Sequence, residues 1–277
     1  MRLQPILCLM ITMMSSACVS ETLPNNFPEA LTYHDKPIDP LCFTENEPSN
    51  NQSLDKCGAQ FSSELEIIDK DQKLIDSGYI GYEYNWSDKT DPAIQSRGYS
   101  YYKVIGYFNH RYTVYALNNG GGTGHFTSLN LVTRKNDTLH VAPIVMGDRC
   151  NGGVSSPSQK NHTLSFSIHI TAYDLLTLTQ QNPNHLRAYD DLDACASCCI
   201  GVATYDLNLV NKKEKMKLVS VTFDKGIDLT LANNNTNDNH QSCLNQLIGA
   251  SIKSGKRSFS PKELNSLINK FNHLCTQ

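Results

Sequence analysis

The stretch GYSYYKVIGYFNHRYTVYALN, residues 98–118, carries the strongest structural signal in the chain. Aromatic and β-branched residues fill it on both sides of Asn109–His110, which suits a tight two-residue connector. A run of strand-forming residues that is broken once by turn chemistry is typical of a β-hairpin. We therefore predict antiparallel strands over 98–108 and 111–118.

Runs of similar texture continue on both sides of this hairpin. Short connectors separate them, namely the Gly120–Gly124 loop, Asn136–Asp137 and Asn151–Gly152–Gly153. Short consecutive strands with tight connectors indicate an antiparallel meander, here of about six to eight strands. The further candidate strands are 79–86, 126–134, 138–146, 163–170, 200–210 and 216–223.

Three stretches predict helices around this sheet. Each contains a helix start with Ser or Thr three residues ahead of Asp or Glu, which is the pattern of a capping box. The predicted helices are 64–76 after Ser63, a short helix from Thr171 to near Gln180, and a C-terminal helical hairpin over 241–275 whose second helix starts at Ser260–Pro261. The expected fold class is therefore α+β, an antiparallel meander with flanking helices and a C-terminal helical hairpin.

Length and composition agree with an ordinary folded domain. The chain has 277 residues, of which 39% are hydrophobic, and a formal net charge of −3. The sequence pI of about 6.3 argues against a dedicated nucleic-acid-binding protein, which would be distinctly basic. We expect a Pro- and Asn-rich, extended N-terminal segment over 21–60, lying on the surface, and a single α+β domain over 61–277.

The N-terminus has the three parts of a secretory signal peptide. A positive start at Met1–Arg2 precedes an apolar run over 5–14 and the small residues Ser15–Ser16–Ala17. We therefore predict a signal peptide over 1–20. Ser15–Ser16–Ala17–Cys18 also resembles a bacterial lipobox, although Ser15 stands where Leu is usual. Cys18 is thus a lipidation candidate, and ordinary cleavage after Ala17 or near Ser20 is the alternative.

Eight cysteines remain once Cys8 and Cys18 are set aside, and in an exported chain eight can pair completely as disulfides. They are Cys42, Cys57, Cys150, Cys195, Cys198, Cys199, Cys243 and Cys275. Two antiparallel helices of similar length place the start of the first beside the end of the second. The helical hairpin therefore predicts a Cys243–Cys275 bridge.

The run Cys195–Ala196–Ser197–Cys198–Cys199 has three interpretations. It could be a thioredoxin-like redox site, a zinc site with Cys150 as fourth ligand, or a set of structural disulfides. We favour structural disulfides, because nothing basic adjoins Cys195 and because exported thiols are normally oxidised. Adjacent Cys198 and Cys199 must reach different partners. If Cys150 takes one of this run, Cys42 and Cys57 can bridge the others and staple the N-terminal segment to the core. A local Cys42–Cys57 loop is the alternative.

Two glycine-rich loops are the candidates for chemistry. Gly120–His125 has neither the Lys nor the following helix of a phosphate-binding loop, so we predict a flexible hairpin loop. An anion-binding backbone nest with His125 at its edge is the alternative. In Gly147–Gly153, Arg149 would lower the pKa of Asp148 and so weaken it as a general base. A structural role is favoured there, and His125, Asp148 and Arg149 are the catalytic candidates of the enzyme alternative.

These motifs together resemble a family of proteobacterial periplasmic or secreted proteins of unassigned activity. The shared pattern is the glycine loop at 120–124, Gly147–Gly153, Ala172–Leu176, and Asp191–Leu192 with Ser197–Cys198, in that order. The resemblance covers about residues 98–205. It implies an exported bacterial protein and a Cys150–Cys198 bridge, and it implies no activity. Cys195 and Cys199 depart from the pattern, which leaves their pairing open.

The sequence therefore favours an exported, disulfide-stabilised, non-enzymatic binding module of the envelope, or a secreted effector. The alternative is a small hydrolase-type enzyme with its site at the 120–125 and 147–153 loops. We predict no cofactor, no metal and no nucleic-acid partner. The expected partner is a protein, envelope or host ligand, with membrane contact only through an N-terminal lipid.

Overall fold

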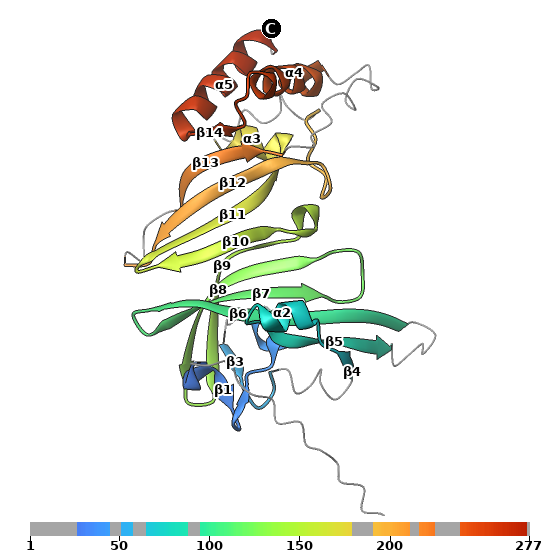
Figure 1. Cartoon of the computed structure of the whole chain (residues 1–277), viewed down its shortest axis with the longest axis vertical. Helices are drawn as coiled ribbons and strands as arrows, with labels where there is room; N and C mark the ends of the chain where they lie inside the picture. The colour runs from blue at the N-terminus through green and yellow to red at the C-terminus, as the bar shows by residue number, and fades with distance from the viewer. Residues whose placement is uncertain are drawn as a thin grey trace, which may run out of the picture.

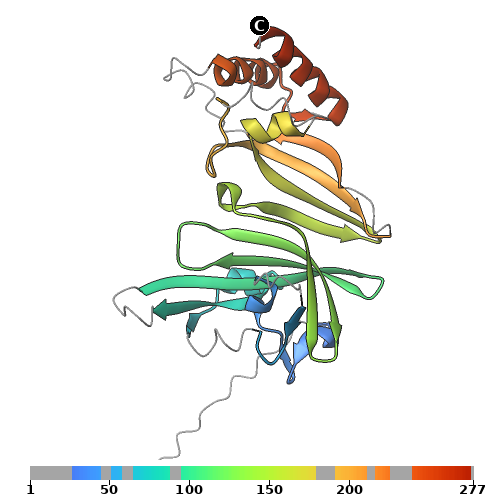
Figure 2. The ribbon, with the colours of Figure 1, turned by 180° about the vertical axis from the view of Figure 1, so that it is seen from behind.

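The computed structural model describes residues 27–44, 51–57, 65–87, 95–178, 191–210, 216–224 and 239–275. These residues stack in four layers along the long axis of the molecule, as the front and back views both show (Figure 1, Figure 2). In order, the layers are the N-terminal segment, a seven-stranded sheet, a five-stranded sheet and a group of helices. The boundary between the two sheets is the centre of the molecule.

The seven-stranded sheet is antiparallel throughout, in the order β3-β9-β8-β7-β6-β5-β4. The hairpin predicted over 98–118 is its central pair. Asn109 and His110 turn between the two strands with φ of 48° and 60°, the left-handed region that a two-residue hairpin turn requires. The strands are β3 (Asn51–Ser53), β4 (Glu66–Asp69), β5 (Ile80–Ser87), β6 (Gln95–Phe108), β7 (Arg111–Asn119), β8 (Phe126–Lys135) and β9 (Thr138–Gly147).

The five-stranded sheet is also antiparallel and runs in chain order from β10 to β14. Its strands are β10 (Val154–Lys160), β11 (Thr163–Thr171), β12 (Cys199–Asn208), β13 (Lys217–Phe223) and β14 (Ser258–Phe259). The sequence pattern does not predict β10, because Pro157 and three serines give this segment the composition of a loop. The sheet accommodates Pro157 because β10 is an edge strand, with a bulge between Ser155 and Ser158.

Helices cover the outer face of the five-stranded sheet and form a common hydrophobic core with it (Figure 1). They are α3 (Ala172–Thr177), α4 (Asn239–Lys253) and α5 (Pro261–Leu274). The capping boxes predicted for α3 and α5 are present: Thr171 and Asp174 cap each other's backbone N–H groups, and so do Ser260 and Glu263. These caps explain why both helices begin where the sequence predicts.

The N-terminal segment covers the opposite face of the seven-stranded sheet. On that face it forms two 3-10 turns, η1 (Glu29–Leu31) and η2 (Pro40–Phe43), and a small hairpin of β1 (Thr32–Tyr33) and β2 (Lys36–Pro37), and its strand β3 joins the edge of the sheet. Leu31, Ile38 and Phe43 are buried against the sheet, and the rings of Phe43 and Tyr102 lie 4.4 Å apart between centroids. This segment is therefore part of the core, whereas the sequence predicts irregular surface chain.

The helix predicted over 64–76 is wrong for most of its length. Residues Glu66–Asp69 form strand β4, and the helix α2 spans only Gln72–Asp76. The Asp71 carboxylate accepts hydrogen bonds from the backbone N–H groups of Lys73 and Leu74, which starts the helix there. Ahead of it, the β-branched pair Ile67–Ile68 favours an extended chain that pairs with β5.

The fold class predicted from the sequence is confirmed. The described residues form an antiparallel α+β protein with a C-terminal helical hairpin and four disulfides. They contain fourteen strands, more than the sequence predicts, because several short strands carry no alternating pattern. Within these residues, no helix has both the length and the apolar character needed to cross a membrane.

Candidate functional site

A groove of about 730 Å³ lies between the two sheets. Its floor comes from β6, β7 and β8, and its wall comes from β10 and the turn η3 (Arg149–Asn151). This volume is within the range of small-molecule sites. The lining residues with chemically distinctive side chains are Tyr79, Tyr99, Lys103, Tyr115, His125 and Gln159.

Strand register directs these side chains into the groove. Lys103 of β6 lies opposite Tyr115 of β7, so both project from the same face of the sheet. Tyr99 is four residues before Lys103 and shares that face, because alternate residues of a strand point to the same side. Tyr115 packs against Val154 of β10, which identifies this face as the one turned toward the five-stranded sheet.

Hydrogen bonds hold the wall of the groove against its floor. The Tyr115 hydroxyl donates to the Val154 carbonyl at 2.7 Å, and the Val154 N–H donates to Thr127 Oγ1 at 2.7 Å. Farther along β10, Thr113 Oγ1 donates to Gln159 Oε1 at 2.5 Å. Polar side chains of β7 and β8 therefore set the position of β10.

Two β-bulges shape the groove. One interrupts β6 between Val104 and Gly106, and the other interrupts β10 between Ser155 and Ser158. In the second bulge Ser156 has a φ of 49°, a left-handed conformation that is uncommon outside glycine. A Cβ atom at Gly106 would lie only 2.5 Å from Gln159 Oε1, so glycine allows β10 to approach this closely. β-Bulges are common next to active sites, where they change the direction in which a side chain points.

Lys103 brings positive charge to the groove. Its Nζ donates to the Ser77 carbonyl at 2.6 Å and lies 5.6 Å from the centroid of the Tyr79 ring. An ammonium over a ring face is attracted by the π electrons, which helps to fix the lysine. The described lining residues include Lys103 and no carboxylate, so the groove favours an anionic ligand.

His125 faces Tyr99 at the edge of the groove. Its Nδ1 lies 2.7 Å from the Tyr99 hydroxyl, and the two rings stack with 5.8 Å between centroids. The preceding loop is braced by Asn119, whose Nδ2 donates to the carbonyls of Gly122 and Gly124. The loop that the sequence predicts to be flexible is therefore supported by internal hydrogen bonds that help to place His125.

The three groove tyrosines are hydrogen-bond donors at neutral pH. Burial raises the pKa of Tyr79, Tyr99 and Tyr115 above the usual tyrosine value, because desolvation disfavours the phenolate. Their hydroxyls therefore stay protonated. The Tyr115 hydroxyl is bonded to Val154 and the Tyr99 hydroxyl to His125, so these two residues offer a ligand mainly the apolar faces of their rings.

The two glycine-rich loops singled out in the sequence meet in the structure. Thr127, two residues after His125, donates through its hydroxyl to the Gly152 carbonyl at 3.2 Å. Asn151 and Gly152 line the same groove as His125. The sequence predicts an alternative enzyme site where these loops meet, and His125, Asn151 and Gly152 are the residues of the two loops that line the groove.

The three catalytic candidates differ in position. His125 lines the groove and bonds to Tyr99. Asp148 is outside the lining, and its Oδ2 lies 3.7 Å from the point that a Cβ atom at Gly124 would occupy. The side chain of Arg149 is outside the described part of the chain. The hydrogen-bond partner of His125 Nδ1 is therefore the Tyr99 hydroxyl, whereas a catalytic His–Asp pair would need a carboxylate at that position.

Sequence reasoning missed the tyrosines and Lys103 as site residues. The alternation of Tyr99, Tyr101 and Lys103 places these side chains on one face of a strand, and that signal is visible in the sequence. It does not reveal that the missed strand β10 covers this face. Because β10 forms the wall of the groove, a prediction that lacks β10 contains no groove. The aromatic residues then indicate only the core of a sheet.

The cysteines pair in four disulfides, with 5.1 to 6.2 Å between the Cα atoms of each pair, within the usual range. The pairs are Cys42–Cys57, Cys150–Cys199, Cys195–Cys198 and Cys243–Cys275. The Cys243–Cys275 bridge predicted from the helical hairpin is confirmed. The lipidation candidate Cys18 and the predicted signal peptide lie outside the described residues.

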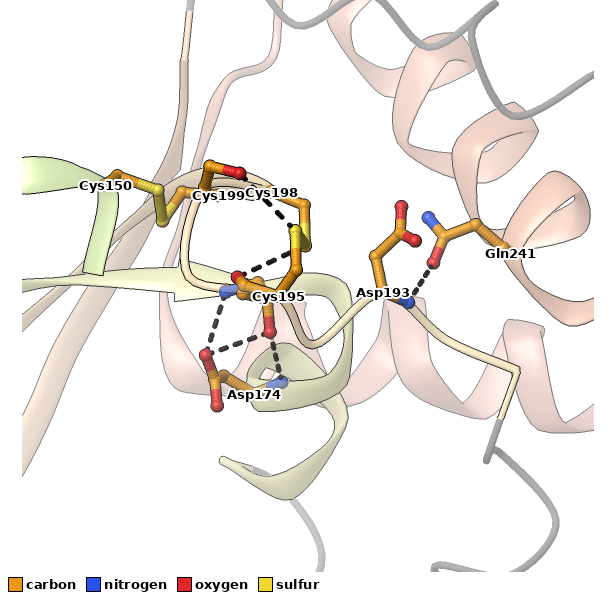
Figure 3. The surroundings of a disulfide bond; sticks show 9 residues. Cys150, Asp174, Asp193, Cys195, Cys198, Cys199 and Gln241 are labelled. Carbon is orange, nitrogen blue, oxygen red and sulfur yellow. Dashed lines mark hydrogen bonds between the residues drawn. A yellow bond between two sulfur atoms is a disulfide. The ribbon is translucent and has the colours of Figure 1, made fainter. Parts of the chain in front are cut away.

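Two expectations about the cysteines are wrong. Cys150 bonds to Cys199 and not to Cys198, because consecutive residues entering strand β12 point in opposite directions (Figure 3). The Cys195–Cys199 run does not staple the N-terminal segment, since Cys42 and Cys57 close a local loop beyond the seven-stranded sheet. All three sulfurs of the run and the sulfur of Cys150 are in disulfides, so none of the four is a thiolate that could bind zinc as the zinc hypothesis requires.

No match for this chain is found among protein-family models, curated proteins or solved structures.

Proposed function

We propose that this chain is an exported, disulfide-stabilised binding module that holds a small anionic ring compound in the groove between its sheets. The observation that carries the proposal is the joint presence of tyrosine ring faces and the Lys103 ammonium on one concave surface. Ring faces bind planar or cyclic ligands by stacking. The ammonium adds a preference for negative charge.

The groove also has the stiffness that a binding site needs. Tyr115, Thr127 and Thr113 bond its floor to β10. The disulfide from Cys150 ties the turn at the groove's edge to the start of β12. A site whose walls are fixed before the ligand arrives loses less conformational entropy on binding, which favours affinity.

Export is supported by the covalent framework. Four disulfides indicate an oxidising environment, and the N-terminal sequence has the pattern of a signal peptide. The resemblance to proteobacterial periplasmic or secreted proteins points in the same direction. Whether the mature chain is lipidated at Cys18 or released is part of the same proposal, and the mass of its N-terminal peptide would decide it.

The proposal is tested by titrating the oxidised protein with two probes, 4-hydroxybenzoate and glucuronate, by NMR. We expect shifts confined to groove residues for one or both anions, and none for the neutral analogues phenol and glucose at the same concentrations. Lys103→Met should weaken binding at least about fivefold, because it removes the charge and keeps the stem.

Lys262→Met is the matched control, because Lys262 is exposed in the first turn of α5 and is not among the residues that line the groove. It should bind like the wild type. Tyr99→Leu should also weaken binding, because it removes the ring that stacks on His125. Melting temperatures of all variants check that each is folded. Absence of any groove shift with both anions, or equal binding by Lys103→Met, would contradict the proposal.

A further inference from the structure

Two disulfides lie side by side next to the helical layer. Cys150–Cys199 helps to hold the edge of the groove, and Cys195–Cys198 has no such role. Cys150–Cys199 ties η3 to β12, whereas Cys195–Cys198 closes a loop that contains only Ala196 and Ser197 (Figure 3). A disulfide that closes so short a loop restricts the unfolded chain very little, and this one does not link two separate helices or strands. Its structural contribution is therefore the smallest of the four.

The Cys195–Cys198 bridge is also open to solvent. Cys195 is exposed and Cys198 is half-buried, whereas Cys42 and Cys57 are 1% and 8% exposed. Thiol–disulfide exchange requires a thiolate to reach a disulfide sulfur, so access is a first condition for reactivity. Cys195 meets this condition.

The segment around the bridge is anchored independently of it. Before the loop, Leu192 is buried in the helical core and the Asp193 N–H donates to Gln241 Oε1 at 2.8 Å. Within the loop, the Cys150 N–H donates to the Ala196 carbonyl at 2.7 Å. After it, Cys199 is held by its own disulfide. Opening Cys195–Cys198 therefore leaves both sulfurs close together, as a reversible redox pair requires.

The two sulfurs have different surroundings. Cys198 Sγ lies 3.2 Å from the Cys195 carbonyl, inside the turn, where an approaching thiolate meets backbone. Cys195 Sγ is on the exposed side and lies 3.7 Å from Ser197 Oγ. A hydroxyl at this position can donate to a thiolate that forms on Cys195. Cys195 is thus the sulfur that is attacked, and Cys198 is the sulfur that leaves first.

We propose that Cys195–Cys198 is a thiol–disulfide exchange site whose partner is an accessible dithiol. A partner thiolate attacks Cys195 Sγ, the Cys195–Cys198 bond breaks, and Cys198 leaves as a thiolate that takes up a proton. The second partner thiolate then attacks the partner sulfur of the mixed disulfide and releases Cys195 as a thiolate. Two electrons pass to this chain, the partner gains a disulfide, and each thiol proton lost by the partner is balanced by one taken up here.

The first experiment uses the oxidised full chain and dithiothreitol as the dithiol. Aliquots are quenched by alkylation, and the opening of each bridge is followed by peptide mass spectrometry. We expect Cys195–Cys198 to open at least about tenfold faster than the other three bridges, which serve as internal references. Opening no faster than Cys243–Cys275 would overturn the proposal.

The second experiment asks whether the site turns over. Reduction of insulin by dithiothreitol is followed by turbidity, with wild type and the C195S/C198S variant at equal concentration. The wild type should accelerate the reaction, and the variant should not, while its melting temperature stays close to that of the wild type because the bridge joins no elements. Equal rates with the two proteins would show an exposed but inert disulfide and overturn the proposal.

A single-cysteine trap identifies the attacked sulfur. With glutathione disulfide as the probe, Cys198→Ser should form a mixed disulfide at Cys195 faster than Cys195→Ser forms one at Cys198, because Cys195 is the accessible position. The opposite order would contradict the assignment of Cys195 as the attacked sulfur.

Discussion

Gly153 and Gly122 belong to the two glycine-rich loops, yet their backbones have different requirements. Gly153 has a φ of +43°, and a Cβ atom there would collide with the Gly147 carbonyl and with Thr127 Oγ1. A Cβ atom at Gly122 would meet nothing within 4 Å. Of these two positions, Gly153 is the one where conformation and contact both demand glycine, and it lies where the chain crosses from one sheet to the other.

Gly153→Ala should therefore lower the free energy of unfolding by about 2–4 kcal/mol, because the backbone must shift to relieve a contact with main-chain atoms. Gly122→Ala, the matched control, should change it by less than about 0.5 kcal/mol. Urea denaturation followed by circular dichroism measures both. Similar losses for the two variants would show that the crossing does not need glycine.

At the scale of elements, α5 shows how local chemistry defines a helix end. Glu263 accepts hydrogen bonds from Lys256 Nζ at 2.5 Å and from the Ser260 N–H at 2.8 Å. These bonds favour the carboxylate, and they lower the pKa of Glu263 from 4.5 to about 2. A capping box, a nearby lysine and Pro261 at the first turn together fix the start of the helix.

The Glu263 carboxylate makes the stability of this end depend on pH. Since the pKa is lower in the folded chain than in the unfolded one, the contribution is complete above a pH of about 4.5 and is lost as the pH falls through about 2. Glu263→Gln should remove this part of the acid sensitivity. Urea midpoints at a pH of about 5 and of about 2.5 measure it, and a wild-type drop no larger than that of Glu263→Gln would refute the assignment.

At the scale of the whole molecule, the central question is whether the two sheets behave as one unit. They share a core that contains Tyr115, Leu129, Val154 and Phe166. The Tyr115 hydroxyl bonds across the boundary to Val154. The sequence predicts a single domain over 61–277, and a shared core with polar cross-links is the physical basis for cooperative unfolding.

Tyr115→Phe tests this coupling. It should cost about 1–3 kcal/mol, because the buried Val154 carbonyl loses its donor from the other sheet. The whole unfolding transition should shift, with both tyrosine fluorescence and circular dichroism reporting the same midpoint. Tyr107→Phe is the control, since Tyr107 is 52% exposed, and it should change stability by less than about 0.5 kcal/mol. Two separate transitions, with only one shifted, would show that the sheets unfold independently.

The accuracy of each prediction from the sequence depended on how far apart in the chain the interacting residues lie. Strands β5 to β9 and the capped helices α3 and α5 were found because period-two patterns, turn residues and caps act over a few residues. The prediction of a helix over 64–76 was wrong because it gave the capping pattern at Ser63-x-x-Glu66 more weight than the β-branched pair Ile67–Ile68, which favours a strand. Of the candidate site, His125 and the 147–153 loop were identified, whereas Tyr79, Tyr99 and Lys103 were not.

By itself, the sequence determined the α+β class, the central hairpin and the Cys243–Cys275 bridge, because each depends on contacts between neighbouring residues or between two helices that follow each other closely in the chain. Only the tertiary structure decided that β10 crosses the tyrosine face to make a groove, and that Cys150 pairs with Cys199 and leaves Cys195 with Cys198. Those outcomes depend on how two sheets pack, and packing is set by the summed shape and polarity of surfaces far apart in the chain. No local pattern encodes it.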